Sequence, residues 1–164
     1  MLESFQVPKD QATVVMELPP DVPARVVIFL SPFAEHHRGQ ETVSDLFRNS
    51  SPFLPVRNAE GKSVLVRKKA VRAMKILEPE RVEWLYFEMR DGAPRYRISV
   101  SFYDGLDMEG YIVATTPVGH QRVSDVVNLT GPFIHIEAED GVYLLNLAHV
   151  STIRIVEEAH GDAG

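Results

Sequence analysis

The residues of this chain best suited to chemistry are two Ser-Asp pairs. Ser44-Asp45 and Ser124-Asp125 each follow a valine and lie 80 residues apart. Two carboxylates of this kind can bind a metal ion or act as general acid and base. They can also accept hydrogen bonds from the free backbone N–H groups at the start of a helix. Because every copy of a helical turn needs such an acceptor, we expect Asp45 and Asp125 to be structural caps.

The histidines lack the spacing of a metal or hydrolase site. His36-His37, His120, His135 and His149 form no His-x-x-x-His pair, and adjacent histidines on a strand point to opposite faces. We expect them to be solvated surface residues, and we predict no metal and no cofactor. The sequence has no cysteine, no Gly-x-Ser-x-Gly elbow, no phosphate-binding loop and no dinucleotide motif. We therefore expect no enzymatic activity.

A basic cluster is the best candidate for binding. It comprises Arg67, Lys68, Lys69, Arg72 and Lys75. These cations could bind the phosphates of RNA with a salt-dependent affinity. They could also form a charged surface turn that keeps strand edges from aggregating. No aromatic residues that would stack on unpaired bases are interleaved with the cluster.

The elements that carry these residues form an internal repeat. At an offset of 80, six of the 20 positions from Thr42 to Gly61 are identical to their counterparts, and such self-similarity predicts a copied folding unit. The six matching positions are Val43, Ser44, Asp45, Pro52, Phe53 and Gly61 in the first copy, and Val123, Ser124, Asp125, Pro132, Phe133 and Gly141 in the second. We expect Phe53 and Phe133 to be core anchors.

Alternating apolar residues predict mostly antiparallel strands, with a short helical turn in each copy. In the second copy, residues 96–102 alternate strictly, and Asp104-Gly105 predicts a tight hairpin into a strand over 107–115. Gly110 suggests a bulge or a sharp bend. A helical turn over 124–129 follows. Three more strands are expected over 132–137, 142–147 and 150–155.

The repeat predicts two domains. The first β-barrel repeat spans 1–78, and the second spans 79–164 with a structured connector at 79–94. Residues 13–78 carry a net charge of +3 and residues 79–164 a net charge of −8, so the copies differ in polarity. The first residues show no secretory signal, and no apolar run is long enough to span a bilayer. We therefore expect a cytoplasmic protein with no membrane partner.

The connector allows two interpretations. Pro79 and Glu80 favour a short helix, because proline is accepted at the first helical position. The aromatic residues Trp84, Tyr86 and Phe87, followed by a turn, favour a strand. We favour the strand.

The segment from Asp104 to Gly110 resembles the Asp-Gly hairpin of Sm-like proteins, and residues 149–153 resemble their last strand. The resemblance implies a small, strongly bent SH3-like barrel in each copy. It also implies nucleic-acid binding as an alternative function. An extra segment, 117–131, lies where Sm-like proteins join two strands directly. The Lys-His pair that reads uridine in RNA-binding members falls at Leu147 and Ala148, so that mode of RNA recognition is not implied. The repeated Val-Ser-Asp and Pro-Phe pattern also resembles a bacterial family of unassigned activity.

These observations predict a non-catalytic interaction or regulatory module, built as a pseudo-dimer of two five-stranded barrels. The expected partner is another protein or a second copy of the chain. The alternative is an Sm-like RNA-binding protein that uses the basic cluster. A cyclic-dinucleotide or other small-molecule sensor is a more remote alternative, because the arginine-rich motif of such barrels is missing.

Overall fold

The computed structural model describes residues 8–159, and within this range the chain is mainly β. The strands are β1 (Asp10–Glu17), β2 (Ala24–Leu30), β3 (Phe53–Arg57), β4 (Ser63–Arg67), β5 (Ala73–Ile76), β6 (Arg95–Phe102), β7 (Asp107–Val113), β8 (Phe133–Ala138), β9 (Gly141–Asn146) and β10 (Val150–Ala159). The helices are α1 (Val43–Arg48), α2 (Pro79–Val82), α3 (Trp84–Arg90) and α4 (Val123–Leu129), and the 3-10 turns are η2 (Lys68–Ala70) and η3 (Leu147–His149).

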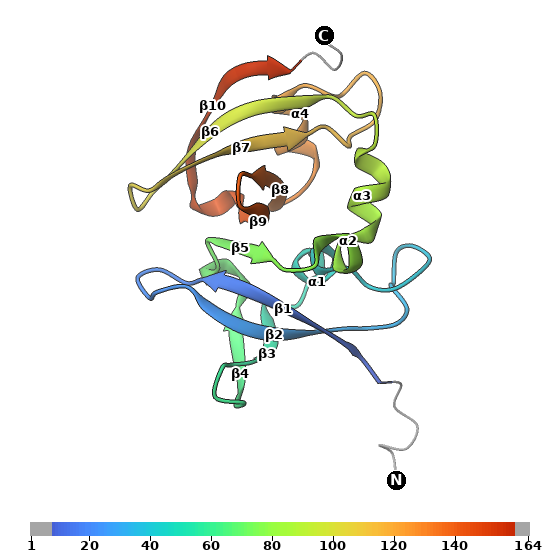
Figure 1. Ribbon diagram of the computed structural model, residues 1–164, viewed down its shortest axis with the longest axis vertical. Coiled ribbons are helices and arrows are strands. Elements are labelled where there is room, and N and C mark those ends of the chain that lie inside the picture. The colour runs from blue at the N-terminus through green and yellow to red at the C-terminus, as the bar shows by residue number, and fades with distance from the viewer. Residues whose placement is uncertain (1–7, 160–164) are drawn as a thin grey trace.

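All ten strands belong to one antiparallel sheet (Figure 1). Its order is β10-β6-β7-β8-β9-β5-β1-β2-β3-β4, with β10 and β4 at the two edges. The sheet does not close, so the expectation of two separate five-stranded barrels is not confirmed, and the strands form one continuous sheet instead. The antiparallel strands and the helical turn over 124–129 are confirmed.

The sheet order repeats within the two halves of the chain. The first half runs β5-β1-β2-β3-β4 and the second runs β10-β6-β7-β8-β9, so corresponding strands occupy corresponding places. The halves are joined by antiparallel pairing of β5 with β9, from Ala73 opposite Leu145 to Ile76 opposite Val142. The fifth strand of one half therefore pairs with the fourth strand of the other.

Alternation along the strands builds two hydrophobic clusters. In β1, Ala12, Val14 and Met16 are buried, while the residues between them are half-buried. One cluster lies mainly in the first half and the other mainly in the second. The division is not complete, since Phe133 and Leu144 of the second half belong to the first-half cluster. The two halves therefore share apolar surface as well as strand hydrogen bonds.

The connector is helical, so the preference for a strand was wrong. Pro79 occupies the first turn of α2, and α3 carries the aromatic residues. Tyr86 of α3 is buried, and the Trp84 indole N–H donates to the Gln40 carbonyl at 3.1 Å. A helix places one side of this segment against the junction of the halves, and that packing overrides the strand propensity of its aromatic residues. Figure 1 shows α2 and α3 running along one side of the molecule between the two halves.

Two glycines mark close approaches between elements. A Cβ on Gly110 would lie 2.7 Å from the Glu137 carbonyl oxygen, so β7 and β8 could not come this close with a larger residue. The register of β6 with β7 continues unbroken through Gly110, so the predicted bulge is absent. Gly39 lies under the Trp84 ring and has a φ of 97°. A Cβ on Gly39 would lie 2.6 Å from Cζ2 of Trp84.

Within residues 8–159, no helix has the length and apolar character to cross a bilayer.

Candidate functional site

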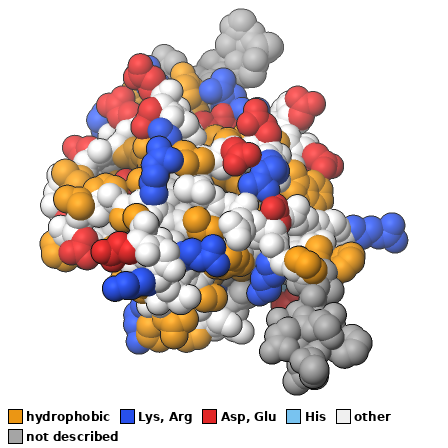
Figure 2. Space-filling view, turned by 60° about the horizontal axis from the view of Figure 1, so that its bottom comes forward, with side chains coloured by type: hydrophobic (Ala, Val, Ile, Leu, Met, Phe, Trp, Pro, Cys, Tyr) orange, Lys and Arg blue, Asp and Glu red, His pale blue; other side chains and the backbone are white. Residues whose placement is uncertain are grey.

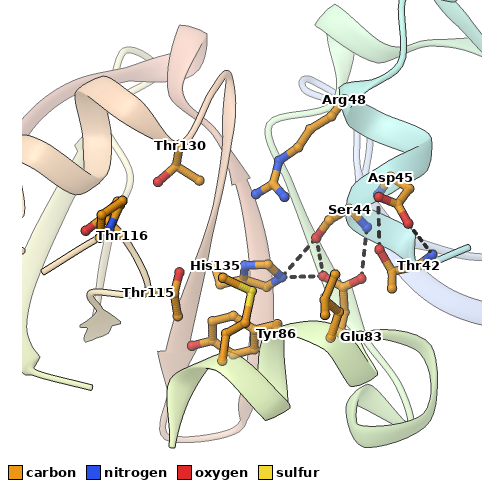
Figure 3. A pocket seen from close by; sticks show the side chains of 13 residues that line it. Thr42, Ser44, Asp45, Arg48, Glu83, Tyr86, Thr115, Thr116, Thr130 and His135 are labelled. Carbon is orange, nitrogen blue, oxygen red and sulfur yellow. Dashed lines mark hydrogen bonds and ion pairs between the residues drawn. The ribbon is translucent and has the colours of Figure 1, made fainter. Parts of the chain in front are cut away.

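Three polar side chains from distant parts of the chain meet at the junction of the two halves (Figure 3). Ser44 comes from α1, Glu83 from the point between α2 and α3, and His135 from β8. The Ser44 backbone N–H donates to Glu83 Oε1 at 2.8 Å. The Ser44 hydroxyl donates to Glu83 Oε2, and His135 Nε2 lies against the same oxygen and 3.0 Å from Ser44 Oγ.

Glu83 is a charged group held in the interior. Its exposed fraction is 0%, while those of Ser44 and His135 are below a tenth. Burial raises the pKa of Glu83, but the charge of His135 and the hydrogen bonds from His135 and Ser44 outweigh burial and place the pKa below its ordinary value of 4.5. Tyr86 stacks on His135, with ring centroids 3.9 Å apart, and seals the cluster from one side.

The geometry of this cluster does not fit a Ser-His-acid relay. Such a relay needs the serine and the acid at opposite nitrogens of the imidazole. Here Ser44 and Glu83 both lie at Nε2 of His135, and the described residues provide no hydrogen bond to Nδ1. The serine proton is directed at Glu83, whose lowered pKa makes it a weak base. The cluster is instead suited to fastening α1, the connector and β8 to one another.

A cavity of about 270 Å³ opens beside this cluster. Its walls come from α1, from the connector helices and from the second half, so it lies between the halves. Figure 3 shows the guanidinium of Arg48 and the side chains of Thr115 and Thr130 around the space next to His135. Leu85 and Met89 of α3 add apolar surface.

Arg48 has unused hydrogen-bonding capacity in this cavity. Its Nη2 donates to the Phe133 carbonyl at 3.2 Å. No acidic oxygen within residues 8–159 lies within 4 Å of its guanidinium. Burial by the surrounding atoms lowers the pKa of Arg48, while the charges of Glu83 and Asp45 partly oppose the shift. The cavity therefore presents a cationic donor with most of its N–H groups free.

The two repeated aspartates lie in the first turns of α1 and α4. Asp45 Oδ2 accepts from the Thr42 N–H at 2.8 Å, and Asp125 Oδ2 accepts from the Arg122 N–H at 3.0 Å. Both are at the third helical position rather than at the N-cap itself, and each reaches back to the backbone of the N-cap residue. Asp45 Oδ2 also lies 2.7 Å from His37 Nε2. Among the residues that the structure describes, Asp125 has no such partner, because Pro117 stands at the position that corresponds to His37. Each aspartate thus has a capping role, and no group of three metal-ligating side chains occurs within the described range.

The repeated serines differ in their surroundings. Ser44 is buried in the cluster, whereas Ser124, its counterpart, is exposed. In α1 the Ser44 side chain contacts Glu83 and His135, whereas α4 buries Val123 and Val126 and leaves Ser124 exposed. His135 lies opposite Pro55 in the repeat, and Glu83 belongs to the connector. Within residues 8–159 the cluster therefore occurs once.

The remaining repeated positions serve the turns and the core. The carbonyls of Pro52 and Pro132 accept from the N–H of Lys68 and Leu147, the first residues of η2 and η3, at 2.9 and 2.8 Å. Gly61 and Gly141 have φ values of 78° and 147°, in the range that glycine favours.

The two phenylalanines of the repeat lie in different surroundings. Phe133 is 4% exposed and packs on Phe47 with ring centroids 5.0 Å apart. Phe53 is 39% exposed and is covered by the Arg67 guanidinium, which lies 4.3 Å from the ring centroid. Only Phe133 therefore has the core position that was expected of both.

The basic cluster is largely engaged within the molecule. Lys68 is buried and its Nζ donates to Asn49 Oδ1 at 2.6 Å. Arg72 pairs with Glu17 at 2.7 Å and also with Asp104, and Lys75 lies 3.6 Å from Asp140. Arg67 and Lys69 remain exposed, so the five cations do not form one open patch. On the face that Figure 2 presents, Lys and Arg side chains are separated by apolar, acidic and other side chains.

The histidines are not all surface residues. His36 is exposed, but His135 is 9% exposed and belongs to the buried cluster, which corrects the expectation for that residue. His149 Nε2 lies 2.8 Å from the Lys69 carbonyl, across the junction of the halves.

Glu83 and Arg48 were not identified from the sequence. The repeat contained one signal that could have identified Arg48. Its counterpart is Asn128, so the helical turn does not require an arginine at this position. Glu83 had no comparable signal, because its role depends on where the connector packs. Comparison of the chain with protein-family models, with curated proteins and with solved structures finds no match in any of the three.

Proposed function

We propose that this chain is a non-catalytic interaction module, made of two copies of one SH3-like unit, which associates with a second copy of itself through its free sheet edges. The observation that supports it most is the pairing of β5 with β9. This pairing joins the fifth strand of one half to the fourth strand of the other. It leaves the other fourth strand, β4, and the other fifth strand, β10, at the two edges of the sheet.

The two edges have the properties of strands that accept a neighbour. On β4, Val64 and Leu65 are 39% and 68% exposed; on β10, Ile155 and Val156 are 49% and 41% exposed. An edge strand offers unpaired backbone N–H and C=O groups, and apolar side chains on it favour addition of another strand. Contact of β4 with β10 of another copy would reuse the combination of strands already found between β5 and β9. Such head-to-tail contact gives closed rings or open filaments, according to the angle between copies.

The RNA-binding alternative has less support. Lys68, Arg72 and Lys75 have partners inside the molecule, which leaves Arg67 and Lys69 to contact phosphates. Two exposed cations give a weak electrostatic contribution, because affinity for nucleic acid scales with the number of phosphates neutralised.

Light scattering coupled to size-exclusion chromatography tests the proposal. The parent chain should be larger than a monomer at high micromolar concentration. Leu65→Lys on β4 and Ile155→Lys on β10 should each shift it toward the monomer, because a buried lysine in a new strand pair is costly. Val118→Lys is the matched control, since Val118 is 90% exposed and belongs to the loop between β7 and α4 rather than to an edge strand. A parent that is monomeric at all concentrations, or assemblies that ignore both edge substitutions, would contradict the proposal.

A further inference from the structure

The cavity between the halves carries a second inference, independent of the sheet edges. Its walls join three parts of the chain: Arg48 from α1, Leu85 and Met89 from α3, and Thr115 and Thr130 from the second half. At about 270 Å³ it is smaller than the pockets that hold drug-sized ligands. Any guest is therefore a small molecule, and it would contact both halves at once.

Arg48 defines the chemistry of that guest. A guanidinium has five N–H donors, and Arg48 uses one contact, to the Phe133 carbonyl. Surrounding atoms desolvate the Arg48 guanidinium in part, but the residue keeps enough exposed surface for a ligand to reach it. In Figure 3 its guanidinium points into the space beside His135. The planar fork of arginine matches a carboxylate, which it binds through two parallel hydrogen bonds.

The two carboxylates in the cavity wall, Glu83 and Asp45, make their hydrogen bonds to groups other than Arg48. Glu83 accepts from the Ser44 N–H and hydroxyl and from His135. Asp45 accepts from the Thr42 N–H and from His37. With their own donors in place, these carboxylates remain near the cavity as negative charges. They favour a singly charged guest over a doubly charged one such as phosphate, because like charges repel in a partly enclosed site.

The repeat shows that Arg48 is not there to build its helix. The helices α1 and α4 share Val-Ser-Asp, but α4 has Asn128 where α1 has Arg48. The helical turn thus forms without an arginine at this place. Arginine occurs in the copy that faces the cavity.

We propose that the cavity binds a small monocarboxylate, with Arg48 gripping the carboxylate and a short apolar tail lying against Leu85 and Met89. The hydroxyl-bearing residues Thr115 and Thr130 form the opposite wall and favour a polar guest at the carboxylate end. Because the ligand contacts α1, the connector and the second half, it stabilises their packing when it binds.

Butyrate is the probe that tests this site, with butyramide as its neutral isostere and inorganic phosphate as the dianionic competitor. Binding to the full chain is followed by ligand-observed NMR and by amide shifts of the protein at low salt. Butyrate should bind and shift the signals of Thr115, Thr130 and His135. Butyramide should bind at least about tenfold more weakly, because it lacks the charge-assisted bonds. Equal binding of acid and amide, tighter binding of phosphate, or no binding of butyrate would each overturn the proposal.

Substitutions of Arg48 test whether this residue binds the carboxylate of butyrate. Arg48→Leu should weaken butyrate binding by roughly tenfold or more, and Arg48→Lys should fall between parent and Arg48→Leu, because it keeps the charge but not the fork. Arg25→Gln removes a cation from an exposed position at the start of β2 and should leave binding unchanged. Circular dichroism of each variant confirms that the fold is kept. Unchanged butyrate affinity in folded Arg48→Leu and Arg48→Lys would overturn the assignment.

Discussion

Glu83 illustrates how a buried carboxylate can be kept charged. It has no exposed surface, yet the Ser44 N–H, the Ser44 hydroxyl and His135 all point at its two oxygens. Taking a carboxylate out of water costs several kcal/mol, and only well-placed donors and an opposite charge offset that cost. The carboxylate therefore ties three segments together at one point, and removal of any one donor would leave a buried group unsatisfied.

Replacing Glu83 with glutamine should destabilise the protein. The side chain keeps its shape but loses its charge, so His135 and Ser44 lose their common acceptor, and a loss of about 3–5 kcal/mol in the free energy of unfolding is expected. Urea denaturation measures it. Glu80→Gln, an exposed position in α2, is the control and should change the free energy of unfolding by less than about 0.5 kcal/mol.

The same pair of proteins gives a pH signature. Because the pKa of Glu83 is lowered on folding, its contribution to stability is present above pH 4.5 and is lost as the pH falls through the folded-state pKa. The difference in the free energy of unfolding between parent and Glu83→Gln should therefore shrink as denaturation is repeated below pH 4.5. A difference that stays constant down to pH 3 would show that the charge of Glu83 does not contribute.

At the scale of elements, equivalent strands of the two halves bury different residues. β8 lies inside the sheet between β7 and β9, while β3 has only the edge strand β4 beyond it. The burial of β8 is nearly continuous from Phe133 to Ile136, whereas β3 alternates and begins with the exposed Phe53. A sequence repeat thus predicts the same element without predicting the same burial.

The two phenylalanines provide a matched test of this difference. Phe133→Ala removes a buried ring that contacts Phe47 and should cost about 3–5 kcal/mol. Phe53→Ala removes a ring that is 39% exposed and should cost about 1 kcal/mol, mainly from the lost contact with Arg67. Chemical denaturation of both variants decides the matter, and similar losses would mean that Phe53 is more buried in solution than the structure shows.

At the scale of the whole molecule, the halves are interdependent. They share the β5–β9 strand pair, the Ser44–Glu83–His135 cluster and an apolar cluster to which Phe133 and Leu144 contribute. Two units of this size are each marginal alone, since small domains bury a modest fraction of their surface. The junction therefore supports both halves.

Separating the halves should reveal this dependence. A fragment of residues 79–164 keeps β6 to β10 but loses β5, which exposes Phe133 and Leu144, so its free energy of unfolding should be roughly 3–6 kcal/mol below that of the full chain. Denaturation and light scattering of the fragment test it. A monomeric fragment as stable as the full chain would show that the halves are independent.

Local pattern alone was enough to predict most of the elements. The alternation over residues 96–102, the Asp104-Gly105 hairpin and the helical turn over 124–129 are confirmed. They follow from forces within a few residues: the period of two along a strand, and the ease with which glycine adopts positive φ. Tertiary contacts decided the rest. They made the connector helical, joined the strands into one sheet, and brought His135 together with Ser44 and Glu83, 91 and 52 residues away along the chain. Equivalent residues took different roles because Ser44 of α1 meets Glu83 and His135, while Ser124 at the matching place in α4 is exposed.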